Sequence, residues 1–97
     1  MIHRGGRGVL MIVTRDVTTD RATLVLEGGV LGPWVDELRR ACDGALASHN
    51  VVTLDLGAVG FIDRAGLALF RELEGRQVRV TNCSPFVAEQ LRGIVAC

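Results

Sequence analysis

Apolar residues near the N-terminus occur in two short stretches that have the length of strands. Residues 9–17 and 22–27 are rich in valine, isoleucine, leucine and threonine, residues typical of β-structure. The polar sequence Thr-Thr-Asp-Arg at 18–21 lies between them and is typical of a turn. The pattern therefore predicts an antiparallel hairpin, with residues 9–17 forming an edge strand.

The spacing of apolar residues then changes from that of a strand to that of a helix. Pro33 suits the first helical position, where a missing N–H costs nothing, and His49 with Asn50 suits a C-terminal cap. Between these ends, one face of the predicted helix is apolar. Its members are Leu31, Trp34, Val35, Leu38, Ala41, Cys42, Ala45 and Leu46. Trp34 and Cys42 are thus predicted to be core residues, and burial argues against a reactive thiolate at Cys42.

The centre of the chain reads VVTLDL over residues 51–56. These apolar and β-branched residues predict a strand buried on both faces. A glycine-containing loop is expected next, and it leads to Asp63, after which a helix begins. Asp63 stands where an N-cap belongs, with its carboxylate able to accept from free backbone N–H groups. If it acts only as a cap, Asp63 should tolerate replacement by asparagine, which also caps helices well.

A further strand is predicted at 77–81, and Ser84-Pro85 then opens a last helix as a cap and a first-turn proline do. Val87, Leu91, Ile94 and Val95 give this helix an apolar stripe. The order ββαβαβα predicts an α/β domain with a mixed sheet of about four strands and three helices. Residues 9–97 are assigned to this single domain, and the polar, glycine-rich residues 1–8 to a disordered arm.

Charge and composition exclude several classes of function. Eleven basic residues balance eleven acidic ones, so there is no electrostatic case for nucleic acid. No apolar run approaches the roughly 18 residues of a membrane-spanning helix or forms a signal-peptide core, so a cytoplasmic protein without membrane insertion is expected.

The three cysteines, Cys42, Cys83 and Cys97, are odd in number and widely spaced. We therefore expect reduced thiols, with no metal site, disulfide framework or cofactor.

The segment that joins the central strand to the second helix resembles the signature of STAS domains, the fold shared by anti-sigma-factor antagonists and the cytoplasmic tails of sulfate transporters. The residues that carry this likeness are Asp55-Leu56, followed by Phe61-Ile62-Asp63-x-x-Gly66-Leu67. Residues 78–94 also resemble the strand, Asn-x-Ser-Pro turn and helix of that family. In the phosphorylatable antagonists the signature reads Asp-Ser-Ser-Gly, and its second serine takes the phosphate. Arg64 and Ala65 replace those serines here, so the resemblance implies that Ala65 marks a degenerate phosphosite.

The second helix carries the predicted partner-binding residues. With Phe70 at the centre of its buried face, the residues expected to turn outward or to the flank are Arg64, Ala65, Ala68, Leu69 and Glu72. Two closely spaced alanines let another backbone approach, and a border leucine can fill a shallow pocket. In the family this helix start, with Asp63, meets the partner. The plain alternative is that alanine and leucine are simply good helix formers.

These features predict a non-catalytic interaction module without a serine phosphoswitch. The resemblance implies three classes of partner: an anti-sigma kinase-like regulator, the ATPase of an ABC-type lipid transporter, or a larger STAS scaffold. A homodimer formed through a strand edge also stays open.

Two alternatives remain at this point. Ser84 could carry a regulatory phosphate in an antagonist that uses another site. Asp55 and Asp63 could form a carboxylate pair for an enzyme or a nucleotide-binding domain. No histidine or serine nucleophile supports that pair in the sequence, and chemistry that needs a lysine is excluded because every basic residue is arginine.

Overall fold

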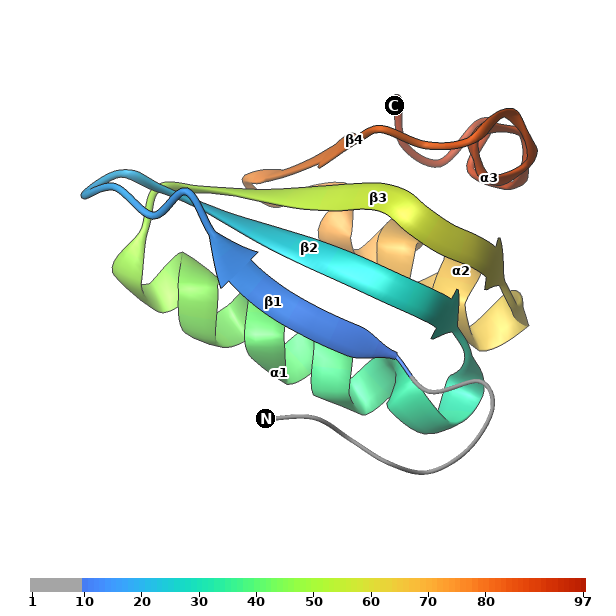
Figure 1. Ribbon diagram of the computed structural model, residues 1–97, viewed down its shortest axis with the longest axis horizontal. Coiled ribbons are helices and arrows are strands. Elements are labelled where there is room, and N and C mark those ends of the chain that lie inside the picture. The colour runs from blue at the N-terminus through green and yellow to red at the C-terminus, as the bar shows by residue number, and fades with distance from the viewer. Residues whose placement is uncertain (1–9) are drawn as a thin grey trace.

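The computed structural model describes residues 10–97, so the arm predicted at residues 1–8 lies outside the described residues. Strands and helices follow the predicted order ββαβαβα (Figure 1). They are β1 (Met11–Arg15), β2 (Arg21–Val30), α1 (Gly32–Ser48), β3 (Val51–Ile62), α2 (Arg64–Leu73), β4 (Val78–Thr81) and α3 (Pro85–Gln90). The predicted fold class is confirmed.

The four strands form one mixed sheet in the order β1-β2-β3-β4. β1 pairs with β2 in the predicted antiparallel hairpin, and β2, β3 and β4 are parallel. Both parallel connections advance in the same direction across the sheet, so right-handed crossovers place α1 and α2 on the same face. Figure 1 shows both helices beneath the sheet.

This one-sided arrangement corrects the prediction that the central strand is buried on both faces. Burial alternates along the first half of β3: Val52, Leu54 and Leu56 are fully buried on the face that α1 and α2 cover. Thr53 and Asp55, which point to the opposite face, are only partly buried. A strand buried on both faces needs a reversal of strand order that brings a crossover helix to the second face, and this sheet has no such reversal.

The predicted loop after residue 56 is also wrong, because β3 continues to Ile62. Its second half pairs in parallel with β2 as far as Val30↔Ile62, with two register shifts on the way. Glycine in a strand interior often marks such an irregularity, and Gly57 and Gly60 lie in this half. As a result, β2 and β3 end side by side.

β4 pairs only with the first half of β3, and α3 lies beside the second half (Figure 1). The side-chain amide of Gln90 accepts from the backbone N–H of Ile62 (3.0 Å) and donates to its carbonyl oxygen (2.7 Å). Gln90 thus satisfies backbone groups that a neighbouring strand would otherwise bind. Ser84 caps α3 as predicted, accepting from the N–H of Val87 at 3.2 Å.

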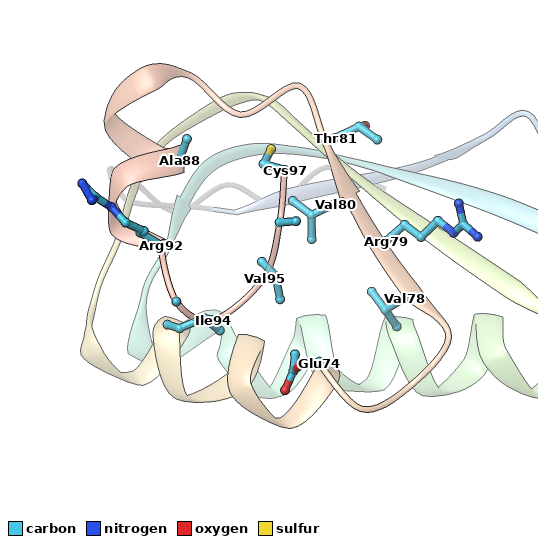
Figure 2. A pocket seen from close by; sticks show the side chains of 12 residues that line it. Glu74, Val78, Arg79, Val80, Thr81, Ala88, Arg92, Ile94, Val95 and Cys97 are labelled. Carbon is cyan, nitrogen blue, oxygen red and sulfur yellow. The ribbon is translucent and has the colours of Figure 1, made fainter.

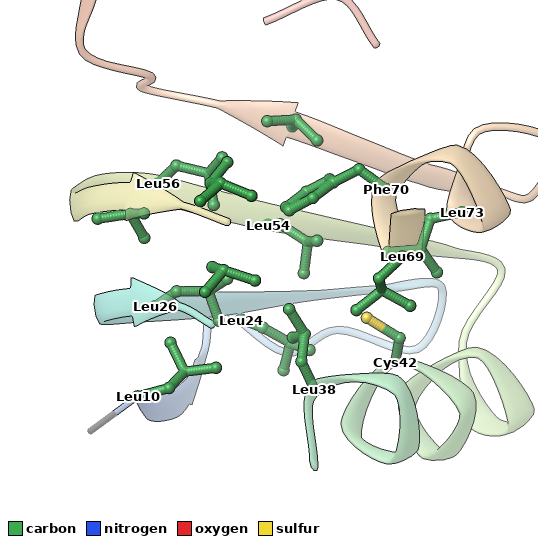
Figure 3. Packing of buried hydrophobic residues seen from close by; sticks show 14 of the residues in the cluster. Leu10, Leu24, Leu26, Leu38, Cys42, Leu54, Leu56, Leu69, Phe70 and Leu73 are labelled. Carbon is green, nitrogen blue, oxygen red and sulfur yellow. The ribbon is translucent and has the colours of Figure 1, made fainter. Parts of the chain in front are cut away.

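The core lies between the sheet and the helices (Figure 3). Val35, Leu38 and Cys42 are buried on α1, and the rest of its predicted apolar face is partly buried, so that prediction is confirmed. Burial, followed by the neighbouring charge of Asp43, raises the pKa of the Cys42 thiol to about 11. Cys42 therefore stays protonated at neutral pH, as its predicted lack of reactivity requires.

The other two cysteines correct the prediction of reduced thiols. Cys83 and Cys97 form a disulfide whose Cα atoms are 6.1 Å apart. α3 ends at Gln90, earlier than the apolar stripe through Val95 predicts, and the chain turns at Gly93 with a φ of +84°. This turn returns the C-terminal residues to the end of β4, so cysteines 14 residues apart meet. The spacing of cysteines along the chain gives no sign of this return.

Gly66 in α2 lies against the ends of β2 and β3, where a larger side chain does not fit. A Cβ atom at this position would come within 2.8 Å of Cγ2 of Ile62 and closer still to the carbonyl oxygen of Val30. Gly66→Ala should therefore lower the free energy of unfolding by about 1–3 kcal/mol, despite the better helix propensity of alanine. Denaturant unfolding measures this loss.

The matched control is Gly44→Ala in α1, where an added Cβ meets nothing within 4 Å. There the same change should stabilise the domain by about 0.5–1 kcal/mol. Equal effects at the two positions would show that the close approach of α2 to the strand ends is not as described.

Candidate functional site

The candidate site lies at the rim where β2 and β3 end and α1 and α2 begin. In parallel sheets this rim collects helix N-termini and binding residues. Leu31 alone separates β2 from α1, and Asp63 alone separates β3 from α2. The two helix starts are therefore neighbours.

The carboxylate of Asp63 joins these two helix starts. Its Oδ1 accepts from the backbone N–H of Gly66 at 2.8 Å, which confirms the predicted N-cap of α2. Its Oδ2 accepts from the N–H of Gly32 at 2.8 Å. The N-cap residue of α1 is Leu31, whose side chain offers no acceptor. One carboxylate therefore caps both helices, because it can accept with both oxygens.

The exposed face of α2 includes three of the predicted partner-binding residues. Arg64, Ala65 and Ala68 are exposed, as expected. Leu69 is not: its side chain is 0% exposed, so its assignment to the partner-binding surface is wrong. α2 packs against α1 as well as the sheet, and Figure 3 places Leu69 near Leu38 and Cys42 of α1. The sequence-based assignment considered packing against the sheet alone.

Arg71 belongs to the exposed face of α2 but was missed in the sequence. It lies seven residues after Arg64, a spacing of about two helical turns that places both on one face. Neither arginine forms an ion pair within residues 10–97. We call Arg64, Ala65, Ala68 and Arg71 the α2 strip. It is an apolar patch of two alanines with an arginine toward each end.

Glu72 is exposed, but its carboxylate is occupied within the domain. Arg39 of α1 donates from Nε to Oε1 (3.1 Å) and from Nη2 to Oε2 (2.9 Å). These bonds lower the pKa of Glu72 and raise the pKa of Arg39. Arg39 also pairs with Asp36 on its own helix. The predicted role of Glu72 in partner binding is thus less favoured than a role in joining α1 to α2.

Two exposed aromatic residues lie at the same end of β3 and were also missed. Phe61 is 46% exposed and Phe86, in the first turn of α3, is 56% exposed. Their rings stack with centroids 6.2 Å apart and planes at 23°. Phe61 points away from the core because its neighbour Ile62 points into it. The alternation of exposed and buried positions in a strand was the signal that could have identified Phe61.

The structure does not bring Asp55 and Asp63 together, so the hypothesis of a carboxylate pair is wrong. Asp55 accepts from the N–H of Gly57 (2.9 Å) and the side-chain amide of Asn82 (3.1 Å). Asp55 lies within β3, and Asp63 follows the last residue of that strand. At about 3.3 Å per residue, the two carboxylates are on the order of 20 Å apart.

Residues 10–97 contain no cluster of three potential metal ligands from His, Cys, Asp and Glu. Within this part of the chain, no helix has the length and apolar character to cross a membrane.

Asp63 accepts one backbone hydrogen bond with each carboxylate oxygen, and this revises the expectation that asparagine is tolerated. An asparagine side chain at this position would offer one carbonyl oxygen, and its NH₂ group would face the second backbone N–H. We expect Asp63→Asn to lower the free energy of unfolding by about 1–2 kcal/mol, and Asp63→Ala by more. Ser84→Ala, which removes a single cap bond, is the matched control at about 1 kcal/mol. Wild-type stability of Asp63→Asn in denaturant unfolding would contradict the shared cap.

The bond between Arg39 and Glu72 predicts a pH dependence. Since folding lowers the pKa of Glu72 below its ordinary 4.5, the bond stabilises the domain above that pH. This contribution is lost as the pH falls through the lowered pKa. Glu72→Gln should therefore reduce stability slightly at pH 7 and not at all in strong acid. Glu74→Gln, at an exposed residue without an ion pair in residues 10–97, should show no such difference in unfolding experiments.

Comparisons with known proteins identify the family. The sequence model of the family described as "Mlab, STAS domain" matches residues 13–94. None of the curated proteins with which the sequence was compared matches it.

Solved structures share the fold. The anti-sigma factor antagonist SpoIIAA in its unphosphorylated form is 20% identical, with a TM-score of 0.66 over 90% of this chain and 87% of that one. The phosphorylated form of the Bacillus cell fate determinant SpoIIAA is 20% identical, with a TM-score of 0.64 over 84% and 81%. An uncharacterised Shewanella loihica protein with a SpoIIAA-like fold is 12% identical, with a TM-score of 0.58 over 95% and 80%. Together with the family match over residues 13–94, the ββαβαβα fold and the capped helix start show that this chain belongs to the STAS domain family.

Proposed function

We propose that this STAS domain is a non-catalytic module that binds a cytoplasmic protein through the α2 strip. The observation that carries the proposal is the exposed pair Ala65 and Ala68 on the first turns of a helix whose start is fixed by Asp63. Small side chains let a partner approach the helix closely. A rigid helix start reduces the conformational entropy lost on binding.

The charge of the strip indicates the chemistry of the partner. Arg64 and Arg71 lie toward its two ends, and no carboxylate within residues 10–97 neutralises either of them through an ion pair. Arginine is enriched at interfaces because its guanidinium group binds carboxylates with two parallel hydrogen bonds. We infer a partner surface with small apolar residues at its centre and acidic residues at its border.

The family resemblance supports three classes of partner. They are an anti-sigma kinase-like regulator, the ATPase of an ABC-type lipid transporter, and a larger STAS scaffold. SpoIIAA, one of the solved structures with this fold, is itself an anti-sigma factor antagonist. An acidic contact surface is the property that we expect the true partner to have.

We further propose that binding is not controlled by phosphorylation of the α2 start. By the motif around Asp63, Ala65 occupies the position of the family's phosphorylated serine, and its methyl group cannot accept a phosphoryl group. Arg64 beside it carries a permanent positive charge. A phosphoserine would add about −1.5 to −2 charges at this position, and this chain has no means of making that change there.

The test is affinity capture from the native cell, with captured proteins identified by mass spectrometry. Ala65→Glu and Ala68→Glu should each remove the specific partner by placing a carboxylate between the two arginines and its acidic border. The control is Ala47→Glu, at an exposed position in the last turn of α1. Circular dichroism verifies that all variants are folded.

Retention of the same partner by folded Ala65→Glu and Ala68→Glu would overturn the proposed surface. If the partner is lost from Ala47→Glu as well, the α2 strip is not the specific contact.

A further inference from the structure

The Cys83–Cys97 disulfide fixes the C-terminal end of the chain beside β4. An open groove of about 910 Å³ lies there (Figure 2). One wall is β4, and the other consists of residues 92–97, which we call the tail. Val78 and Val80 contribute apolar surface from β4, and Ile94 and Val95 contribute it from the tail.

The disulfide is the main attachment of the end of the tail. Backbone bonds of the tail are local: the N–H groups of Ile94 and Val95 both donate to the carbonyl oxygen of Leu91, at 2.9 and 3.2 Å. Within residues 10–97, no backbone hydrogen bond joins the tail to β4. Ile94 and Val95 are partly buried against the core, but Ala96 and Cys97 are exposed. Removal of the disulfide therefore leaves the last residues without a strong attachment.

The three cysteines differ sharply in accessibility. Cys42 is 0% exposed, and its raised pKa keeps it a thiol. Cys97 is exposed and Cys83 is partly buried, so this disulfide lies at the surface, where it meets small thiolates in solution. The backbone N–H of Cys83 donates to Sγ of Cys97 at 3.1 Å.

We propose that the Cys83–Cys97 disulfide is a site of reversible exchange with low-molecular-weight thiols, and that its reduction releases the end of the tail, Ala96 and Cys97, from the edge of β4. In a cytoplasm, where glutathione and thioredoxin reduce most disulfides, an exposed one is typically transient or redox-sensing. The inference does not depend on the α2 strip or its partner, because the groove and the strip consist of different residues.

The exchange takes place in two steps. A thiolate R–S⁻ attacks Sγ of Cys97, the Sγ–Sγ bond breaks, and its electron pair leaves with Cys83, which then takes a proton. A second R–S⁻ attacks the sulfur of R in the R–S–Sγ mixed disulfide, forming R–S–S–R, and the bond to Sγ of Cys97 breaks, releasing a thiolate that then takes a proton. Overall, two thiols are oxidised to one disulfide and the protein disulfide is reduced to two thiols.

Release of the tail changes the surface beside β4. β4 is the last strand in the sheet order and pairs with β3 alone, so within residues 10–97 its other edge has no strand partner. Once Ala96 and Cys97 are free, the groove loses part of one wall, and this edge is more accessible to solvent. An accessible strand edge presents unpaired backbone donors and acceptors. The redox state of the two cysteines would therefore control access to this edge.

The first experiment measures the thiols of the full chain in glutathione buffers of increasing reduced fraction. Rapid alkylation of the folded protein, read by mass spectrometry, should label no cysteine in the oxidised buffer and Cys83 and Cys97 together in the reduced one. Cys42 should react only after denaturation. Return to the oxidised buffer should restore the unlabelled state. Free thiols in every buffer, or a disulfide that resists excess reduced glutathione, would overturn the exchange.

The second experiment measures release of the tail by limited trypsin digestion. Cleavage after the exposed Arg92 should be several-fold faster in the reduced protein, and hydrogen exchange of β4 should also be faster. Cys97→Ser should match the reduced protein without any reductant. Cys42→Ala, which keeps the disulfide, should match the oxidised protein. Equal cleavage and exchange in the oxidised, reduced and Cys97→Ser proteins would overturn control of the edge by this disulfide.

Discussion

The arrangement of this domain depends on the carboxylate of Asp63, which accepts hydrogen bonds from the first turns of two different helices. Each helix begins with backbone N–H groups that need acceptors. Leu31 cannot serve α1, so α1 depends on a residue that lies far along the chain. The bond also fixes α2 relative to α1, and hence the direction in which the α2 strip faces. The same side chain therefore stabilises the fold and sets the orientation of the proposed docking surface.

The second constraint is the one-directional order of the strands. Because both parallel crossovers advance the same way, both helices cover one face, and they also contact each other. This contact buries Leu69 and brings Arg39 to Glu72. The surface left for a partner is accordingly narrower than a helix lying alone on a sheet would provide. It is centred on Ala68, between two arginines that have no intramolecular ion pair in residues 10–97.

The sequence predicted those features that depend on local chemistry. The hairpin, the buried face of α1 and the caps at Asp63 and Ser84 follow from residues close together in the chain. Burial of Leu69 could not be predicted, because it depends on how α1 and α2 meet. The glycines after residue 56 were ambiguous, since glycine marks both loops and irregular strands. The disulfide was missed because a short helix returns the chain to β4, and cysteine spacing does not report such a return.

The amide of Gln90 has a consequence for the way in which other molecules can approach the rim. It binds both the N–H and the carbonyl oxygen of Ile62, so the free side of β3 has no open peptide group there. An incoming chain cannot extend the sheet by adding a strand at that point. In the proposed docking, recognition next to Ile62 would therefore use side chains, whose identity distinguishes one binding partner from another, whereas peptide groups are common to every protein.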